Sequence, residues 1–411
     1  KSRHQTPKVA LRLTSKVLQR LASPLPSCAL SGVQLPRSGA AGVVSRPHSV
    51  VWRRGLPLRR SVRDSLHGPA ENFAFLPNKA SFVKIKHSNL LSIVAAMTMV
   101  FAGTCAHAAG FQQGVAADPT GKPLALAIWY PSQAMAQPVS MGPTTMTVAM
   151  NAPVNGTALP MIVMSHGTGG SNLGHADTAI ALADAGFVVV ALNHTGDNYA
   201  DQSRSVDVMD RPRQVSRVID HMVSTWEGRA SIDAQHIGMF GFSSGGFTTL
   251  VNIGGVPDFS TIGPMCQQYP ADFACQLLAK GEKPVAPPTA YAVADARIQA
   301  AVVAAPALGF TFAQDGLKNV KVPVQLWRAE NDVVVPHPRY AELVRLALPN
   351  APDYHVAAHA GHYDFLAPCS DALASIAPGI CKSSAGFDRA AFHVSFDAEI
   401  VKFFEKTLKN Q

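Results

Sequence analysis

The chain has 411 residues, a formal net charge of +8 and a pI of about 9.2. Such a balance usually suggests nucleic acid or an anionic membrane as a partner, but here the charge is unevenly spread. Residues 1–86 hold 16 Lys and Arg but only 2 Asp and Glu, which leaves 19 basic and 25 acidic residues in the remainder. The acidic remainder is therefore not predicted to bind nucleic acid.

An export signal is predicted at residues 83–108. Lys84 and Lys86 form a short positive region, residues 90–102 form an apolar run, and Ala-His-Ala at 106–108 matches the pattern cut by signal peptidase. The apolar run is too short to span a bilayer. A buried core helix is the alternative. We expect cleavage after Ala108, a mature protein that is periplasmic or secreted, and no stable membrane span in it.

Two further regions follow from this signal. Residues 1–82 are rich in Arg, Ser and Pro and poor in acidic residues, which predicts either a spurious upstream extension or a disordered basic arm. Residues 109–411, about 300 in all, suffice for one large α/β domain with a proper core.

Alternating apolar strands and helices follow the signal. Helices are predicted at 176–185, 211–226 and 247–253, and a last one carries Phe392, Phe396, Ile400, Phe403 and Phe404 on one side. Strands are predicted at 110–115, 124–130, 160–164, 187–192, 237–240, 298–304, 322–327 and 354–356. This alternation predicts an α/β fold, with a mostly parallel sheet covered by helices on both faces. Residues 255–296 break it and are predicted to form an inserted flap.

Four cysteines lie in the predicted domain, in two close pairs. In an exported chain such spacing favours disulfides, and Cys266–Cys275 with Cys369–Cys381 is the simplest of three connectivities. A metal site is disfavoured because the cysteines show neither a Cys-x-x-Cys spacing nor a nearby His pair.

Gly-Phe-Ser-Ser-Gly at residues 241–245 is the most informative motif. A strand precedes it and a helix follows it, which is the context of a tight turn that exposes a serine nucleophile, here Ser243. Small residues at both ends of the motif are needed because bulk there would clash across the turn. A glycine-rich loop is the alternative.

An acid and a base are expected in loops that follow later strands. Asp332 is the candidate acid, with Glu330 as its rival. His362 is the candidate base, beside Gly361, which allows a tight turn, and His355 and His359 are its rivals. The order Ser, Asp, His along the chain is that of α/β-hydrolases.

Two backbone N–H groups are expected to stabilise an oxyanion. Ser244 directly follows the candidate nucleophile, and Thr168 lies in the glycine-rich loop 166–170. That loop could instead cradle a phosphate, but it lacks the Walker lysine and the dinucleotide Gly-x-Gly-x-x-Gly pattern. No cofactor is expected.

The substrate pocket is expected between the flap and residues 307–320, because loops at this edge of a sheet carry specificity. Phe259, Phe310 and Phe312 are the candidate lining residues. The alternative is that these rings fill small cores of their own loops.

A family resemblance rests on four motifs, at residues 165–170, 241–246, 331–336 and 360–366, together with Trp-Tyr-Pro at 129–131. With these motifs the chain resembles exported bacterial α/β-hydrolases of the "predicted dienelactone hydrolase" type, which are similar to platelet-activating-factor acetylhydrolases. The resemblance implies a serine carboxylesterase. True dienelactone hydrolases carry a cysteine nucleophile where this chain has Ser243.

The function predicted from the sequence is therefore hydrolysis of small or medium acyl esters through an acyl-enzyme, with a small-molecule ester as partner. Amidase or peptidase activity, or hydrolysis of polyesters or lipids, is possible on the same three residues. A non-catalytic binding protein of this fold is the alternative from another class.

Overall fold

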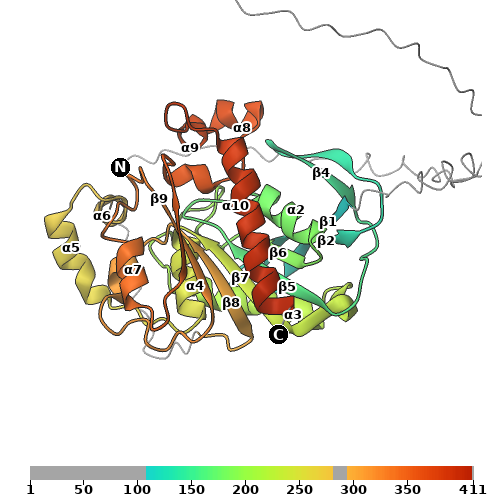
Figure 1. Cartoon of the computed structure of the whole chain (residues 1–411), viewed down its shortest axis with the longest axis horizontal. Coiled ribbons are helices and arrows are strands. Elements are labelled where there is room, and N and C mark those ends of the chain that lie inside the picture. The colour runs from blue at the N-terminus through green and yellow to red at the C-terminus, as the bar shows by residue number, and fades with distance from the viewer. Residues whose placement is uncertain (1–107, 281–293, 410–411) are drawn as a thin grey trace, which may run out of the picture. The chain divides into compact units, whose positions relative to one another are not determined.

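The computed structural model describes residues 108–280 and 294–409 (Figure 1). The predicted leader at 1–82, the signal segment before Ala108 and residues 281–293 of the predicted flap lie outside the described residues. No helix in the described ranges is long and apolar enough to cross a membrane.

A ten-stranded sheet organises the described residues, in the order β10-β9-β8-β7-β5-β6-β2-β1-β4-β3. Six neighbouring strands, from β6 to β10, run parallel, whereas β2 is antiparallel to β6 and to β1. The strands are β1 (Ala108–Ala116), β2 (Leu124–Ser132), β3 (Gln137–Met141), β4 (Thr144–Met150), β5 (Leu159–Ser165), β6 (Val188–Leu192), β7 (Ile232–Phe242), β8 (Ile298–Ala304), β9 (Val324–Ala329) and β10 (Asp353–Ala357).

Helices cover both faces of this sheet. Helices α2 and α10 pack together on one face, where α10 crosses the sheet in Figure 1, and α3 and α4 lie against the other. The helices are α2 (Ala176–Asp184), α3 (Asp210–Ser224), α4 (Ser244–Asn252), α5 (Ile262–Gln268), α6 (Phe273–Ala279), α7 (Ala341–Ala347), α8 (Asp371–Ile376), α9 (Pro378–Cys381) and α10 (Arg389–Phe404). The α/β-hydrolase fold class predicted from the sequence is confirmed.

Side-chain alternation along the strands creates two hydrophobic cores. In β5, Ile162 and Met164 face the core beneath α2 and α10, whereas Met161 and Val163 face the core beneath α3 and α4. A parallel strand buried on both faces needs a continuous apolar run, and this is the pattern from which the strands were predicted.

Strand β5 marks a switch point in the sheet. From β5 the chain crosses to β6 on one side and then returns to β7 on the other. Loops leaving the carboxyl ends of β5 and β7 therefore diverge, which opens space for a ligand above their ends. The candidate residues Thr168 and Ser243 follow these two strands.

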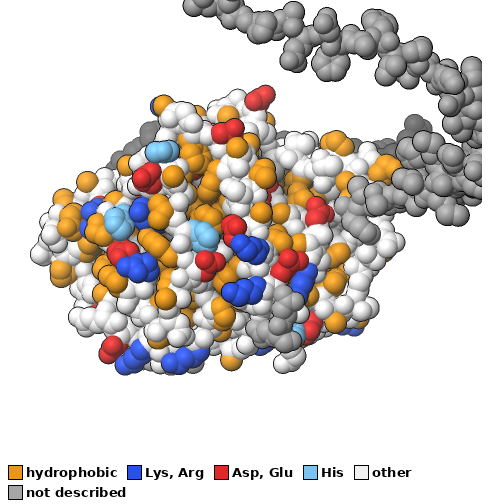
Figure 2. Space-filling view, in the orientation of Figure 1, with side chains coloured by type: hydrophobic (Ala, Val, Ile, Leu, Met, Phe, Trp, Pro, Cys, Tyr) orange, Lys and Arg blue, Asp and Glu red, His pale blue; other side chains and the backbone are white. Residues whose placement is uncertain are grey.

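The surface in this view carries both signs of charge. Lys and Arg side chains are interspersed with Asp and Glu over the face shown in Figure 2, without a large patch of either sign. The basic excess counted in residues 1–86 is therefore not seen on this face.

Both predicted disulfides are present. Cys266–Cys275 joins α5 to α6, within the predicted flap, and Cys369–Cys381 spans the segment of α8 and α9. Such bonds persist in oxidising compartments. They therefore point to an extracellular type of environment for the folded protein.

Replacing Cys369 and Cys381 with Ser should lower the free energy of unfolding by roughly 2–3 kcal/mol, because the bond closes a short loop and restricts the unfolded chain. Chemical denaturation of the variant and of the unreduced parent protein measures this difference. Equal unfolding midpoints and slopes for the two proteins would contradict a stabilising role for this disulfide.

Candidate active site

Ser243 occupies a strained turn between β7 and α4. Its φ of 55° and ψ of −117° lie in a region that non-glycine residues rarely adopt. The turn is held by its backbone, since the Ser243 N–H donates to the carbonyl of Ala304 at 2.9 Å and its own carbonyl accepts from Ala307 at 3.0 Å. Strain maintained in this way is typical of functional positions.

Glycines flank Ser243 where no side chain fits. A Cβ atom on Gly241 would overlap the carbonyl of Gly245, and one on Gly245 would overlap the carbonyl of Ser165 at the end of β5. The motif therefore needs glycine at these positions, as expected, because the backbone of the turn lies in direct contact with the backbone of the neighbouring strand.

Ser243, His362 and Asp332 form one hydrogen-bonded chain. The His362 Nε2 atom lies 3.0 Å from the Ser243 Oγ atom, and its Nδ1 atom lies 2.8 Å from the Asp332 Oδ2 atom. All three residues are buried. Ser243 follows β7, Asp332 follows β9 and His362 follows β10, the last strand. Three loops far apart in sequence therefore converge at one edge of the sheet.

Asp332 is fixed by its own loop. Its Oδ1 atom accepts hydrogen bonds from the backbone N–H groups of Val334 and Val335 at 2.9 and 2.8 Å, which leaves Oδ2 for His362. With Asp332 accepting at Nδ1, the neutral imidazole carries its proton there and presents Nε2 as an acceptor to the serine hydroxyl. This arrangement can deprotonate a serine.

The rival residues are engaged elsewhere. Glu330 accepts from the backbone N–H of His359 at 2.7 Å and lies 3.2 Å from its ring, at an exposed position. His355 stacks on Trp327 at 4.1 Å between ring centroids and pairs with Asp353. In this geometry the rivals do not contact Ser243.

The two candidate oxyanion residues lie side by side. The hydroxyl groups of Thr168 and Ser244 are 2.6 Å apart, which joins the loop after β5 to the first turn of α4. Ser244 is the first residue of α4, so its N–H has no partner within its own helix. Helix ends of this kind favour negative charge.

Comparison with known proteins gives a partial family match and a fold. Residues 146–263 match the dienelactone hydrolase family. This partial match supports a dienelactone hydrolase-like α/β-hydrolase. The matched range includes Thr168 and Ser243, whereas Asp332 and His362 lie beyond it.

A solved structure supports the same fold. A ferulic acid esterase from Streptomyces cinnamoneus aligns with a TM-score of 0.52 and 17% sequence identity, covering 75% of this chain and 92% of that chain. The comparison with curated proteins gave no match.

The candidate pocket residues of the hydrolase differ in their placement. Phe312 is completely buried, and its ring packs 5.3 Å from that of Phe247 in the core beneath α4. Phe259 is half-buried and lies 6.2 Å from the same ring. Phe310 belongs to the opposite core and packs 5.5 Å from Tyr340. The three rings therefore do not form one lining, and the placement of Phe312 favours the core-filling alternative for that residue.

The predicted flap contacts the loop that carries Asp332, a contact that the sequence did not reveal. Asp272, at the start of α6, is nine-tenths buried and accepts from the Arg339 guanidinium at 2.9 Å and from the Tyr340 hydroxyl at 3.0 Å. Arg339 also lies 4.0 Å over the ring of Tyr269. Burial and the nearby Asp272 charge raise the pKa of Tyr340, so that this hydroxyl remains a donor.

The loop of His362 is fastened to α10. The Asp364 carboxylate accepts from the Gly361 N–H at 2.7 Å and from the Arg389 guanidinium at 3.0 Å. Its backbone carbonyl accepts from the His393 Nε2 atom at 2.9 Å. Arg389 and His393 of α10 thus hold the turn that orients His362.

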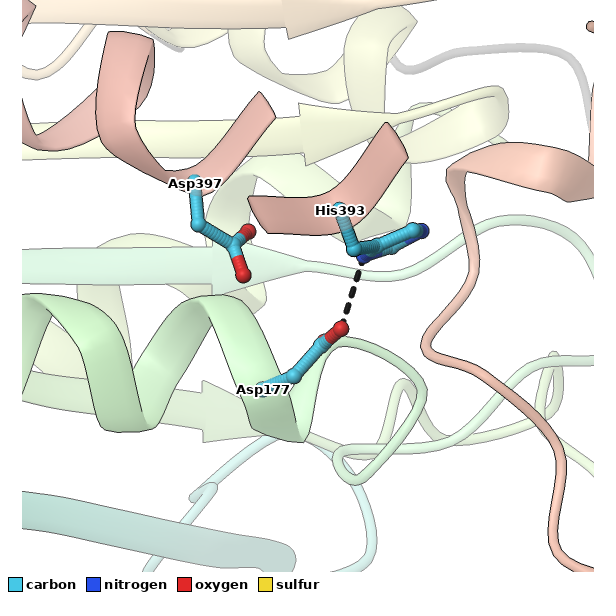
Figure 3. Close-up of side chains that lie close together, drawn as sticks. All are labelled: Asp177, His393 and Asp397. Carbon is cyan, nitrogen blue, oxygen red and sulfur yellow. Dashed lines mark ion pairs between the residues drawn. The ribbon is translucent and has the colours of Figure 1, made fainter. Parts of the chain in front are cut away.

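His393 also belongs to a buried cluster with Asp177 of α2 and Asp397 of α10 (Figure 3). The potential ligand atoms of the three residues lie within 4.8 Å of one another, close enough in principle for a metal ion. The His393 Nδ1 atom, however, pairs with Asp177 at 2.7 Å, and Asp397 accepts from the Thr178 hydroxyl at 2.6 Å. Both ring nitrogens of His393 thus contact protein oxygen atoms, Nδ1 that of Asp177 and Nε2 that of the Asp364 carbonyl. The cluster therefore links α2 to α10.

Asp397 makes this cross-link sensitive to pH. Burial and the neighbouring Asp177 charge raise the pKa of Asp397 to about 7. Burial alone would lower the pKa of His393, but the pair with Asp177 raises it. The folded protein therefore holds the Asp397 proton more tightly than the unfolded chain does, and stability is lost as the pH rises from about 4 to about 7.

Asp397→Asn should remove this loss, because the amide cannot ionise. Between pH 4 and pH 7, the free energy of unfolding of the parent protein should fall by on the order of 3 kcal/mol more than that of the variant. Denaturant unfolding at several pH values measures it, with Glu399→Gln on the same helix as the control. Parallel pH profiles for the parent and Asp397→Asn would contradict the prediction.

Proposed function

We propose that the protein is a serine carboxylesterase with Ser243 as nucleophile, His362 as general base and acid, and Asp332 as the residue that orients His362. The observation that carries the proposal is the continuous hydrogen-bonded chain from Ser243 through His362 to Asp332. Its burial and the strained backbone of Ser243 support the same roles.

The reaction would proceed in two halves. His362 takes the hydroxyl proton of Ser243 as Oγ attacks the ester carbonyl carbon, and the carbonyl oxygen becomes an oxyanion. The backbone N–H groups of Thr168 and Ser244 donate to this oxyanion. The intermediate collapses to an acyl-enzyme as His362 gives its proton to the departing alcohol. Water, deprotonated by His362, then releases the acid and restores Ser243.

The proposed substrates are esters of small or medium acyl groups. The dienelactone hydrolase family and the fold shared with a ferulic acid esterase support ester hydrolysis rather than another chemistry. Phe310, with neighbouring apolar groups such as Leu308, is proposed to contact the acyl chain. The segment that carries both residues begins at Ala307, whose N–H is hydrogen-bonded to the carbonyl of Ser243. Phe259 is proposed to contribute from the flap.

The proposed catalytic domain comprises residues 109–411, with residues 255–296 as an inserted flap. Export to the periplasm or the medium is proposed from the signal pattern before Ala109, and the two disulfides support it. A non-catalytic role on this fold would leave the strain at Ser243 without a use.

Ser243→Ala and His362→Ala should each lower kcat for a chromogenic ester by several powers of ten, because the nucleophile or its base is lost. Asp332→Asn should also lower kcat severely, since the amide favours the wrong histidine tautomer. Glu330→Gln is the matched control and should keep most activity. Full activity of Ser243→Ala would refute the proposal, and loss of activity in Glu330→Gln alone would move the acid to Glu330.

For linear 4-nitrophenyl esters, kcat/KM should rise with acyl length and then fall once the pocket is full. Each buried methylene contributes about 0.8 kcal/mol, or roughly fourfold in kcat/KM. Phe310→Ala should shift the optimum, whereas Phe312→Ala should mainly lower stability. The profiles of the parent and both variants measure this, and an unchanged optimum in Phe310→Ala would place the acyl pocket elsewhere.

A further inference from the structure

A buried ion pair lies beneath the loop that carries Thr168. The Arg211 Nη1 atom of α3 lies 2.5 Å from the Asp197 Oδ2 atom, and both side chains are almost completely buried. Charges so far from solvent are costly unless their hydrogen-bonding capacity is used. The other contacts of this pair therefore matter.

Those contacts hold both ends of one short backbone segment. On one side of Thr168, the Arg211 Nη2 atom donates to the carbonyl of His166. On the other side, the N–H of Gly169 donates to the Asp197 Oδ1 atom at 2.8 Å. Gly169 has a φ of +64° and the turn is closed by a 3.0 Å bond from Gly170 N–H to the Gly167 carbonyl, so the segment has a defined shape as well as fixed ends.

The Arg211 guanidinium is also linked, through Thr248, to Ser244, the second proposed oxyanion residue. The Arg211 Nε atom donates to the Thr248 hydroxyl at 3.1 Å, and that hydroxyl donates to the carbonyl of Ser244 at 2.8 Å. Arg211 therefore connects the loop after β5 to the first turn of α4, whose leading N–H belongs to Ser244.

The groups around the pair are neutral. The His194 Nδ1 atom lies 2.9 Å from the Gln214 amide oxygen, which also accepts from the backbone N–H of Thr195, so Nδ1 carries the proton and Nε2 accepts from Ser165. His166 accepts the backbone N–H of His194 at Nε2. Burial and the Arg211 charge lower the pKa of both histidines. The Asp197 carboxylate thus remains the one counter-charge that contacts Arg211 among the described residues.

We infer that Arg211 and Asp197 are positioning residues of the oxyanion site, which keep the N–H groups of Thr168 and Ser244 at a fixed separation. The inference rests on the proposed serine esterase function. A planar guanidinium with several fixed donors can span these acceptors, whereas a lysine ammonium cannot. Because the two N–H groups stabilise charge that exists only in the transition state, their misplacement should reduce kcat and leave ground-state binding little changed.

Arg211→Lys keeps the positive charge but loses the planar guanidinium with its several donors, and Asp197→Asn keeps the size of the side chain but loses its charge. For a 4-nitrophenyl ester, both variants should show kcat about 10- to 100-fold lower per active site, with KM changed less than about twofold. Active sites are counted by titration with a fluorophosphonate. Affinity for an alkylboronic acid, which forms a tetrahedral adduct with serine, should fall in parallel with kcat.

Arg213→Lys is the matched control. Arg213 lies on the same helix and pairs with Asp118 at 2.7 Å and Asp210 at 2.8 Å. Within the described part of the chain, its hydrogen bonds do not reach the loop or α4. It should leave kcat unchanged, and circular dichroism with thermal melting compares the folding of all variants. Combining Arg211→Lys with Asp197→Asn should cost little more than either change alone, because the two residues act as one unit.

The outcomes are distinguishable. Near-parental kcat per site in either folded variant, or an equal loss in Arg213→Lys, would overturn the inference and leave the esterase proposal standing. Failure of both variants to fold would also overturn it, because the pair would then serve the fold as a whole. Inactivity of the parent protein, or activity retained by Ser243→Ala, would overturn the proposed function and this inference together.

Discussion

The contact of backbone with backbone at the turn after β7 is the constraint on which the site depends. Gly245 lies directly against the carbonyl of Ser165, and Gly241 against that of Gly245, so any side chain there would push α4 away from β5. Close approach brings the start of α4 beside the loop that leaves β5. Without it, the hydroxyl groups of Thr168 and Ser244 could not lie 2.6 Å apart.

The sheet supplies the rest of the geometry by convergence. Because β5, β7, β8, β9 and β10 are parallel neighbours, the loops after their carboxyl ends meet at one edge. Each loop is then fixed by a local device: backbone N–H groups hold Asp332, Asp364 holds the turn of His362, and Ala304 holds Ser243. The side chains therefore meet on rigid supports, which is what a preorganised site requires.

Sequence reasoning located the elements whose signal is local. The strands buried on both faces, the glycine-flanked serine and the cysteine pairs could all be predicted, since a short stretch of residues specifies each of them. The hairpin of β3 and β4 was missed because β3 is short, largely exposed and contains Pro138, which weakens a strand pattern. Helices α5 to α9 were also missed, since each spans only four to seven residues.

The candidate site was predictable to the same extent. Ser243, Asp332 and His362 each lie within five residues of the end of a parallel strand. Their meeting therefore followed from the parallel order, although their roles are proposals. Arg211, Asp197 and Asp272 gave no such signal, because their importance lies in partners that only the fold brings near. Phe312 was expected to line a pocket, and nothing in its own segment indicated that the ring packs under Phe247.

The attachment of the His362 loop to α10 has a consequence for the order of assembly. Arg389 and His393, which grip Asp364, are made long after Ser243 during synthesis. A domain folds as a unit, so the loop that carries His362 is fixed only once α10 has packed against it. A chain cut before α10 would keep Ser243 and its flanking glycines but would lack both residues that hold this loop. The proposed histidine would then have no fixed position opposite the serine hydroxyl.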